Sequence, residues 1–164
     1  MKKATAMFTA ACACLLVNAT AFAAPITADE ALVIAQKQVP ASSTHIVTKV
    51  EMSKINPYYE VEFYGTSTST QYEIDVLQAN GAIKEFSMDA KALLGSKNVT
   101  LSKNDVEAIV KKEYPEAVFK KIELDIDNGL YEYEVKFTAP GVRGEYTLNP
   151  ETGVIMEKKL KYQF

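Results

Sequence analysis

The sequence predicts an α+β protein made of two tandem repeats, each with one helix packed on a three- to four-stranded antiparallel sheet. Two observations support this prediction: the chain repeats itself, and each copy holds a helical pattern followed by alternating strands. The segments 59–63 (YEVEF) and 133–137 (YEVKF) match at four of five positions. Their offset of 74 residues also aligns Tyr72 with Tyr146. A duplicated module explains both matches.

The first 23 residues have the features of a secretory signal peptide. A basic start at Lys2 and Lys3 precedes an apolar stretch over residues 4–17, and 21–23 (AFA) fits a small-x-small cleavage site. The apolar stretch is too short for a membrane span, and no second one follows. We therefore expect cleavage after Ala23 and export to the periplasm or the cell exterior, with no membrane span in the mature chain.

The composition of the mature chain excludes several classes of function. Cys12 and Cys14 lie in the predicted signal peptide, so a disulfide framework and a thiol nucleophile are excluded. Lipid anchoring at one of these cysteines is the less favoured alternative, since neither has a leucine three residues upstream. Without Lys2 and Lys3, the 18 basic residues become 16 against 21 acidic ones, a net charge of −5. With no basic stripe, nucleic-acid binding is disfavoured.

Each copy is predicted to begin with a capped helix. Thr27 and Glu30 have the capping-box spacing, in which both side chains bind free amides at a helix start. Apolar residues at helical spacing then precede a proline: Ala31, Ile34, Ala35, Val39 and Pro40. In the second copy, Ser102 and Asp105 take the cap positions. Its apolar stripe comprises Val106, Ile109, Val110 and Tyr114, before Pro115.

Strands with period-two alternation follow each helix, as expected for sheets with one buried and one solvated face. The predicted core residues are Tyr59, Val61, Phe63, Tyr131, Tyr133, Val135 and Phe137. On the next strand Gln71, Glu73 and Asp75 are placed on the solvated face. The predicted turns are Asn80-Gly81, Asp127-Asn128-Gly129 and Thr152-Gly153.

The predicted organisation is a signal peptide (1–23), a first repeat (24–92), a linker (93–99) and a second repeat (100–164). A short helix is expected over residues 88–94, closed by Gly95. The linker region is not rich in proline, glycine or serine, and Met88, Leu93 and Leu94 favour burial. We therefore expect the two repeats to pack on each other.

These patterns resemble the PepSY domain family in both copies. The resemblance rests on the segments 58–63, 72–75 and 80–83 in the first copy, and 131–135, 146–149 and 152–155 in the second. The acidic residue of the family's D-x-x-T-G turn is matched to Asp75 and Asn149, although the first copy lacks the threonine. The resemblance implies an α+β fold similar to that of β-lactamase inhibitory proteins. It also implies kinship with peptidase propeptides and with regulators of cell-wall hydrolases.

The sequence contains little that could support catalysis, a metal or a cofactor. His45 is the only histidine, so a histidine-rich zinc site is excluded. A catalytic triad would have to use His45, which has no nucleophile-elbow glycines nearby, and a strand-edge histidine is the preferred interpretation. Residues 125–129 (DIDNG) resemble the start of a calcium loop, but Lys136 replaces the bidentate glutamate. No cofactor and no metal are expected.

A candidate binding surface lies on the predicted solvated face. Glu60 and Glu62 share this face about 7 Å apart, as do Glu132 and Glu134, and ordinary solvated carboxylates are favoured over an acid–base pair. The tentative partner-binding residues are Tyr58, Glu60, Glu62, Tyr64, Thr66 and Ser67. Exposed tyrosines beside acids suit protein recognition. The alternative for the tyrosines is that they cover the other repeat's sheet or pair across strands.

The expected function is that of an exported non-catalytic binding protein, an inhibitor or regulator of a secreted peptidase or other exported hydrolase. This expectation comes from the family resemblance, and the expected partner is such an exported protein. The alternative is an envelope module that binds a protein or peptide without inhibiting it. An enzyme is disfavoured, because the sequence has no mature cysteine and a single histidine.

Overall fold

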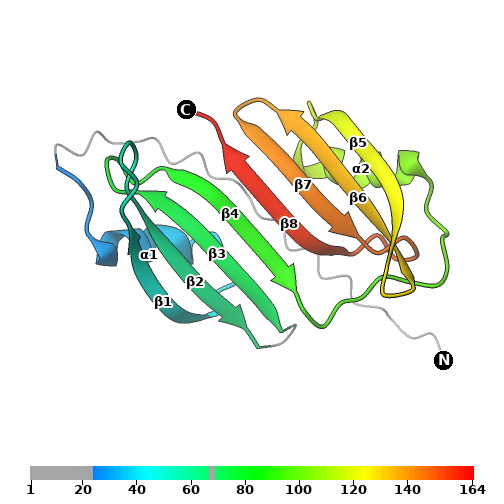
Figure 1. The fold of residues 1–164 in the computed structure, drawn as a ribbon, viewed down its shortest axis with the longest axis horizontal. Coiled ribbons are helices and arrows are strands. Elements are labelled where there is room, and N and C mark those ends of the chain that lie inside the picture. Colours follow the sequence, from blue (N-terminus) through cyan, green and yellow to red (C-terminus); the bar gives the residue numbers. More distant parts are fainter. Residues whose placement is uncertain (1–23, 67–68) are drawn as a thin grey trace.

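The computed structural model describes residues 24–66 and 69–164. The predicted signal peptide, with Cys12 and Cys14, lies outside the described residues, as does Ser67. In the described part of the chain, two short helices accompany one eight-stranded antiparallel sheet (Figure 1). Neither helix is long and apolar enough to cross a membrane.

The helix and four strands occur twice in the same order along the chain. The first half contains α1 (Ala28–Gln36), β1 (Thr44–Glu51), β2 (Tyr58–Gly65), β3 (Thr70–Leu77) and β4 (Ile83–Ala90). The second half contains α2 (Lys103–Glu113), β5 (Val118–Asp127), β6 (Leu130–Ala139), β7 (Val142–Leu148) and β8 (Ile155–Tyr162). In space the strands follow the order β1-β2-β3-β4-β8-β7-β6-β5. β4 and β8 therefore occupy the centre, and β1 and β5 form the edges.

The predicted fold class, an α+β protein of two tandem repeats, each with one helix packed on a three- to four-stranded antiparallel sheet, is wrong. All strands belong to one sheet, because β4 pairs antiparallel with β8, centred on Ser87 opposite Lys159. The physical reason is edge satisfaction: in separate sheets, β4 and β8 would each present unpaired N–H and C=O groups. We call the β4–β8 pairing the seam. The fold is mostly β, with two short helices.

The helix predicted over residues 88–94 is also absent. Residues 88–90 continue β4, and no helix follows in this part of the described chain. Met88 packs against the core, opposite Tyr72 on one side and Lys158 on the other. Strand pairing on both sides outweighs the local helical preference. The connection that follows is tied to β6 by two backbone hydrogen bonds between Ser96 and Tyr131, of 2.7 and 3.0 Å. The proposed domain boundaries stay predictions.

Both predicted capping boxes are confirmed. The Glu30 carboxylate accepts from the Thr27 amide at 2.8 Å, and the Thr27 hydroxyl accepts from the Glu30 amide at 3.3 Å. Asp105 and Ser102 make the equivalent pair at the start of α2, at 2.8 and 3.3 Å. Reciprocal capping satisfies amides that a helix start leaves free.

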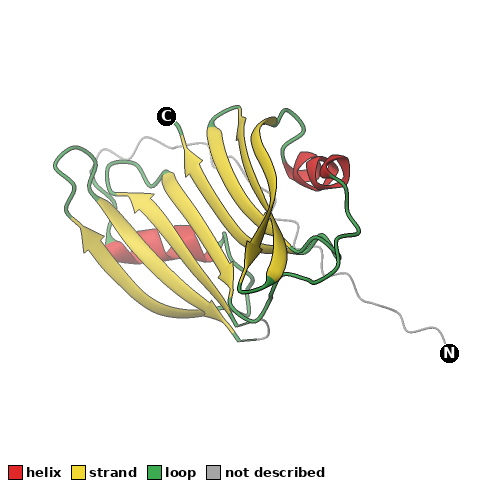
Figure 2. Ribbon diagram, turned by 45° about the vertical axis from the view of Figure 1, so that its right-hand side comes forward, coloured by secondary structure: helices red, strands yellow, loops and turns green. Residues whose placement is uncertain are grey.

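Both helices cover the same face of the sheet (Figures 1 and 2). We call this the helix face, and the opposite one the open face. The core on the helix face is one cluster that includes residues of both halves. Five of the predicted core residues are buried, namely Val61, Phe63, Tyr133, Val135 and Phe137. Tyr59 and Tyr131 are half-buried. The Tyr59 hydroxyl donates to the Ile26 carbonyl at 3.2 Å.

The correspondence between Tyr72 and Tyr146 is wrong by two residues. In the sheet, Ile74 lies opposite Val61, and Tyr146 lies opposite Val135. Tyr146 therefore takes the place of Ile74, and Gly144 takes the place of Tyr72. Gly144 lies directly over the Phe137 ring, and a Cβ atom there would overlap that ring.

The same shift changes the family motif match of Asp75. Asp75 lies opposite Glu60 within β3, and the equivalent position of β7 is Thr147, opposite Glu134. Asn149 instead accepts hydrogen bonds from the amides of Glu151 and Thr152 in the β7–β8 turn. Asp75 is therefore a strand residue rather than a turn residue.

The turn between β5 and β6 is a two-residue hairpin. Asn128 and Gly129 both have positive φ values, +50° and +81°. A two-residue turn with positive φ at both positions has a twist that matches the flanking strands, and Asn-Gly adopts it readily. The hairpin turn predicted for residues 127–129 is confirmed.

A buried ion pair links α2 to the central strands. Lys158 of β8 is only 8% exposed and donates to Glu113 of α2 at 2.5 Å. The Tyr146 hydroxyl donates to the other oxygen of Glu113 at 2.6 Å. Burial, together with the negative charge of Glu113, raises the pKa of Tyr146. These contacts hold α2 over β7 and β8.

Candidate interaction surface

The tentative binding residues on β2 lie together on the open face. Tyr58, Glu60, Glu62 and Tyr64 alternate with the buried Val61 and Phe63, and all four are half-buried. Thr66 is exposed in the turn that follows, so five of the six predicted residues can be placed.

The two glutamates of β2 are held by one lysine of the edge strand. Lys49 donates to Glu60 at 2.9 Å and also contacts Glu62. The side chains of Glu60 and Glu62 are 19% and 32% exposed, so they are less solvated than the sequence suggested. In the second half, Lys121 of β5 donates to Glu134 of β6 at 2.7 Å. Such pairs stabilise the fold little, but they fix the positions of the carboxylates.

Tyr58 is partly covered by a lysine from β4. The Lys84 ammonium lies 3.6 Å from the centre of the Tyr58 ring and donates to Asp75 Oδ2 at 2.7 Å. Asp75 is 5% exposed. Burial raises the pKa of Asp75, and the hydrogen bond from Lys84 opposes that rise. This cross-strand contact partly fits the alternative interpretation of the tyrosines.

Glu73 is a site residue that sequence reasoning did not select. It projects from β3 on the open face and, within the described chain, makes no hydrogen bond or ion pair. Burial raises its pKa, and neighbouring carboxylates, Glu60 first, raise it further. The alternating pattern placed Glu73 on the solvated face, but the grouping of acids appears only once β2 and β3 are paired.

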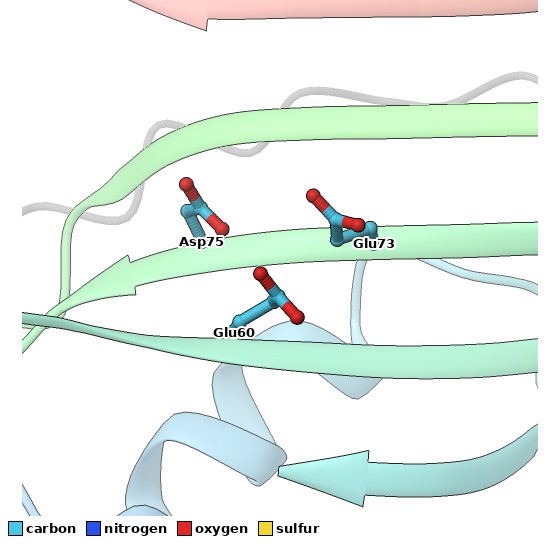
Figure 3. Close-up of side chains that lie close together, drawn as sticks. All are labelled: Glu60, Glu73 and Asp75. Carbon is cyan, nitrogen blue, oxygen red and sulfur yellow. The ribbon is translucent and has the colours of Figure 1, made fainter. Parts of the chain in front are cut away.

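Three carboxylates converge at this point of the open face (Figure 3). Glu60 comes from β2, and Glu73 and Asp75 come from β3. One oxygen from each lies within 4.8 Å of the others. We call these three residues the acid triad. Their oxygens form a hard-ligand set of the kind that binds divalent cations such as Ca²⁺.

Two shallow hollows lie beside β4. One, of about 430 Å³, is lined in part by Glu62, Tyr64 and Glu73. The other, of about 360 Å³, is lined by residues of β6, β7 and β8. Ser87 and Asp89 line both hollows. The open face is therefore one surface to which both halves contribute.

Ion pairs also cross the seam on this face. Lys159 of β8 contacts Glu85 of β4 at 2.8 Å, and Lys161 contacts the same carboxylate at 3.7 Å. The centre of the open face therefore carries both acidic and basic side chains, which suits a partner with mixed charge.

Replacing Glu73 with glutamine should stabilise the protein at pH 7–8. The folded-state pKa of Glu73 is raised, so its ionised form is disfavoured by folding. The contribution of Glu73 to stability should therefore fall as pH rises above about 4.3, the unfolded value, and E73Q should remove this loss. Urea midpoints between pH 4 and 8, measured with EDTA, test this.

The matched control for this prediction is Glu145→Gln. Glu145 occupies the equivalent position on β7 but lies 3.3 Å from the Lys136 ammonium. E145Q should leave the midpoint unchanged or lower it slightly. An E73Q protein less stable than wild type at pH 8 in EDTA would show that Glu73 is not held in an unfavourable environment.

Comparison with known proteins places the chain in a family. The model of the PepSY family, described as "Peptidase propeptide and YPEB domain", matches residues 25–85 and 100–159. No curated protein matches the chain. The Bacillus megaterium YpeB C-terminal domain is similar in structure, with a TM-score of 0.53 and 15% identity. That match covers 82% of this chain and 63% of the other, and at 15% identity the likeness concerns the fold alone.

A second solved structure is a suspected lipoprotein of Clostridium difficile 630, with a TM-score of 0.37 and 14% identity. The match covers 84% of this chain and 95% of that one.

The two family segments together span most of the described residues, one in each half. The chain belongs to the PepSY family of peptidase propeptide and YPEB domains.

Proposed function

We propose that this protein is an exported non-catalytic binding protein that inhibits or regulates a secreted peptidase or other exported hydrolase. The observation that carries the proposal is the open face, which extends across both PepSY segments and which no helix of the described residues covers. The family description names peptidase propeptides, which supports a peptidase as the partner. Export rests on the signal peptide predicted for residues 1–23.

The chemistry of the open face suits recognition of a folded protein. Tyrosine is enriched in protein interfaces, and Tyr58 and Tyr64 flank the glutamates of β2. A paired sheet presents these side chains with little conformational freedom left to lose on binding. The two hollows on either side of β4 would accept side chains that project from a partner.

The surroundings of His45 support the non-catalytic part of the proposal. His45 lies on the edge strand β1, and its ring contacts the edge of the Phe63 ring, with centres 5.7 Å apart. Its Nε2 atom lies 3.0 Å from the Thr48 hydroxyl. These contacts fit a structural histidine at a sheet edge.

Capture followed by an activity assay tests the proposal. Immobilised residues 24–164 should retain an exported hydrolase from the producing organism's secreted proteins, and adding the free protein should lower that enzyme's activity. The double variant Glu62→Lys, Tyr64→Ala should lose both effects, because both residues line the hollow between β2 and β4. Lys112→Ala, at an exposed position of α2, is the matched control and should keep both.

The outcomes separate the parts of the proposal. Capture without a change in activity would contradict inhibition and leave an interaction module. Equal capture by the double variant and by wild type would contradict the open face as the binding surface. Hydrolysis of peptide, ester or glycoside substrates by residues 24–164 alone, lost in His45→Ala, would contradict the non-catalytic assignment.

A further inference from the structure

The acid triad places like charges directly against one another. Glu60 and Asp75 are opposite each other in the β2–β3 pairing, and Glu73 lies two residues before Asp75 on the same face. Like charges directly opposite in a sheet are destabilising. Glu73 has no cation bound to it within the described chain. Lys49 and Lys84 pair with Glu60 and Asp75, so Glu73 is the carboxylate of the triad that no lysine of the described residues pairs with.

A second observation comes from the buried carboxylate of Asp75. Its Oδ2 atom accepts from Lys84 of β4, on the side of β3 away from β2. Its Oδ1 atom is buried and has no hydrogen-bond partner in the described part of the chain. Figure 3 shows one oxygen of Asp75 directed toward Glu60 and Glu73. A buried acceptor without a donor is costly and points to a bound ion or water at that position.

We propose that Glu60, Glu73 and Asp75 bind a divalent cation of the Ca²⁺ type on the open face. Calcium binds oxygen ligands at about 2.3–2.6 Å, so two ligands of one ion can be about 5 Å apart. The triad oxygens, within 4.8 Å of one another, meet this limit. Magnesium, at about 2.0–2.1 Å, gives up its waters reluctantly and is usually held by one or two carboxylates, so a set of three favours calcium. A set of carboxylates also disfavours zinc and copper, which prefer nitrogen and sulfur ligands.

The neighbouring lysines each occupy only one oxygen of the carboxylate that they contact, but their charge limits the affinity for an ion. Lys49 donates to Oε1 of Glu60, and Lys84 donates to Oδ2 of Asp75. The other oxygen of each carboxylate is left, together with both oxygens of Glu73. Three carboxylates against two ammonium groups give a small net negative charge. We therefore expect a dissociation constant of about 10⁻⁴–10⁻³ M, the range of extracellular calcium modules.

The proposed site is independent of the proposed function. It requires only that the three carboxylates are placed as described, and it holds whether or not the open face binds a hydrolase. The proposed calcium site differs from the prediction of no metal made from the sequence. The three carboxylates come together only through the register between β2 and β3, which the sequence did not reveal.

Calorimetric titration of CaCl₂ into metal-free residues 24–164 tests the proposal. We expect saturable binding, and a rise in melting temperature that MgCl₂ or NaCl at matched ionic strength does not reproduce. Glu73→Gln should weaken calcium binding at least tenfold. Glu145→Gln, at the equivalent position of the second half, should leave it unchanged.

Two results would overturn the proposal. The first is the absence of a calcium-specific heat and melting shift up to 10 mM CaCl₂ (roughly ten times the upper end of the expected dissociation constant). Water alone would then satisfy Asp75 Oδ1. The second is a calcium response that E73Q retains in full, which would place the ion elsewhere. Because E73Q changes a solvent-facing side chain of β3, we expect it to fold, and its circular dichroism spectrum checks this.

Discussion

Phe137→Ala should lower the free energy of unfolding by about 3–5 kcal/mol. Phe137 is 2% exposed and lies at the centre of an aromatic cluster. Its ring centre lies 5.2 Å from those of Tyr114 and Tyr146 and 6.3 Å from that of Phe119. Removing the ring would leave a cavity between β6 and α2 that rigid strands cannot collapse to fill.

Chemical denaturation of residues 24–164 measures this effect. Tyr64→Ala on the open face is the control and should cost far less, because Tyr64 is only half-buried. Phe63→Ala, at the equivalent core position of the first half, should behave like Phe137→Ala. If the Phe137→Ala midpoint barely moves while Tyr64→Ala unfolds the protein, the strand faces are exchanged.

Residues 24–97 and 98–164, expressed separately, should not fold stably. A unit of about 70 residues buries only about 60% of its chain surface and is marginal without a disulfide or metal. Separation would also expose β4 and β8 as unpaired edges and divide a core cluster that both halves share. The intact chain should unfold in a single cooperative transition.

Circular dichroism and denaturant titration of the two halves and the intact chain check this prediction. Mixing the halves should restore part of the native signal, because the seam is an intermolecular contact in the mixture. Two independent transitions in the intact chain, each as stable as the isolated half, would show that the seam contributes nothing.

Local features of the fold could be predicted from the sequence because they depend on neighbouring residues. The capping boxes at Thr27 and Ser102 follow from spacings of three residues. The hairpin at Asn128 follows from the need for positive φ. The faces of β2 and β6 follow from strict alternation, which buries Val61 and Val135.

The seam could not be predicted, because it joins segments far apart in the chain. Ser87 lies opposite Lys159, and nothing near either residue specifies the other. The identity of Tyr72 and Tyr146 favoured a wrong alignment. That alignment ignored Gly144, whose missing side chain makes room for Phe137.

The candidate surface shows the same division between local and distant information. Alternation placed Tyr58, Tyr64 and Glu73 on the open face. The contact of Lys84 with Tyr58, and the grouping of Glu73 with acids of β2, depend on strand register instead. Register between strands is set by turns and cross-strand packing over the whole sheet.

Amide hydrogen exchange of residues 24–164 tests the continuous sheet most directly. In a central strand, successive amides bond alternately to the two neighbouring strands, so all of them are protected; in an edge strand every second amide is free. One sheet predicts slow exchange at consecutive amides of β4 (86–89) and β8 (157–161), and alternating fast exchange in β1 and β5. Alternating fast exchange in β4 and β8 would show two separate sheets and contradict the shared open face.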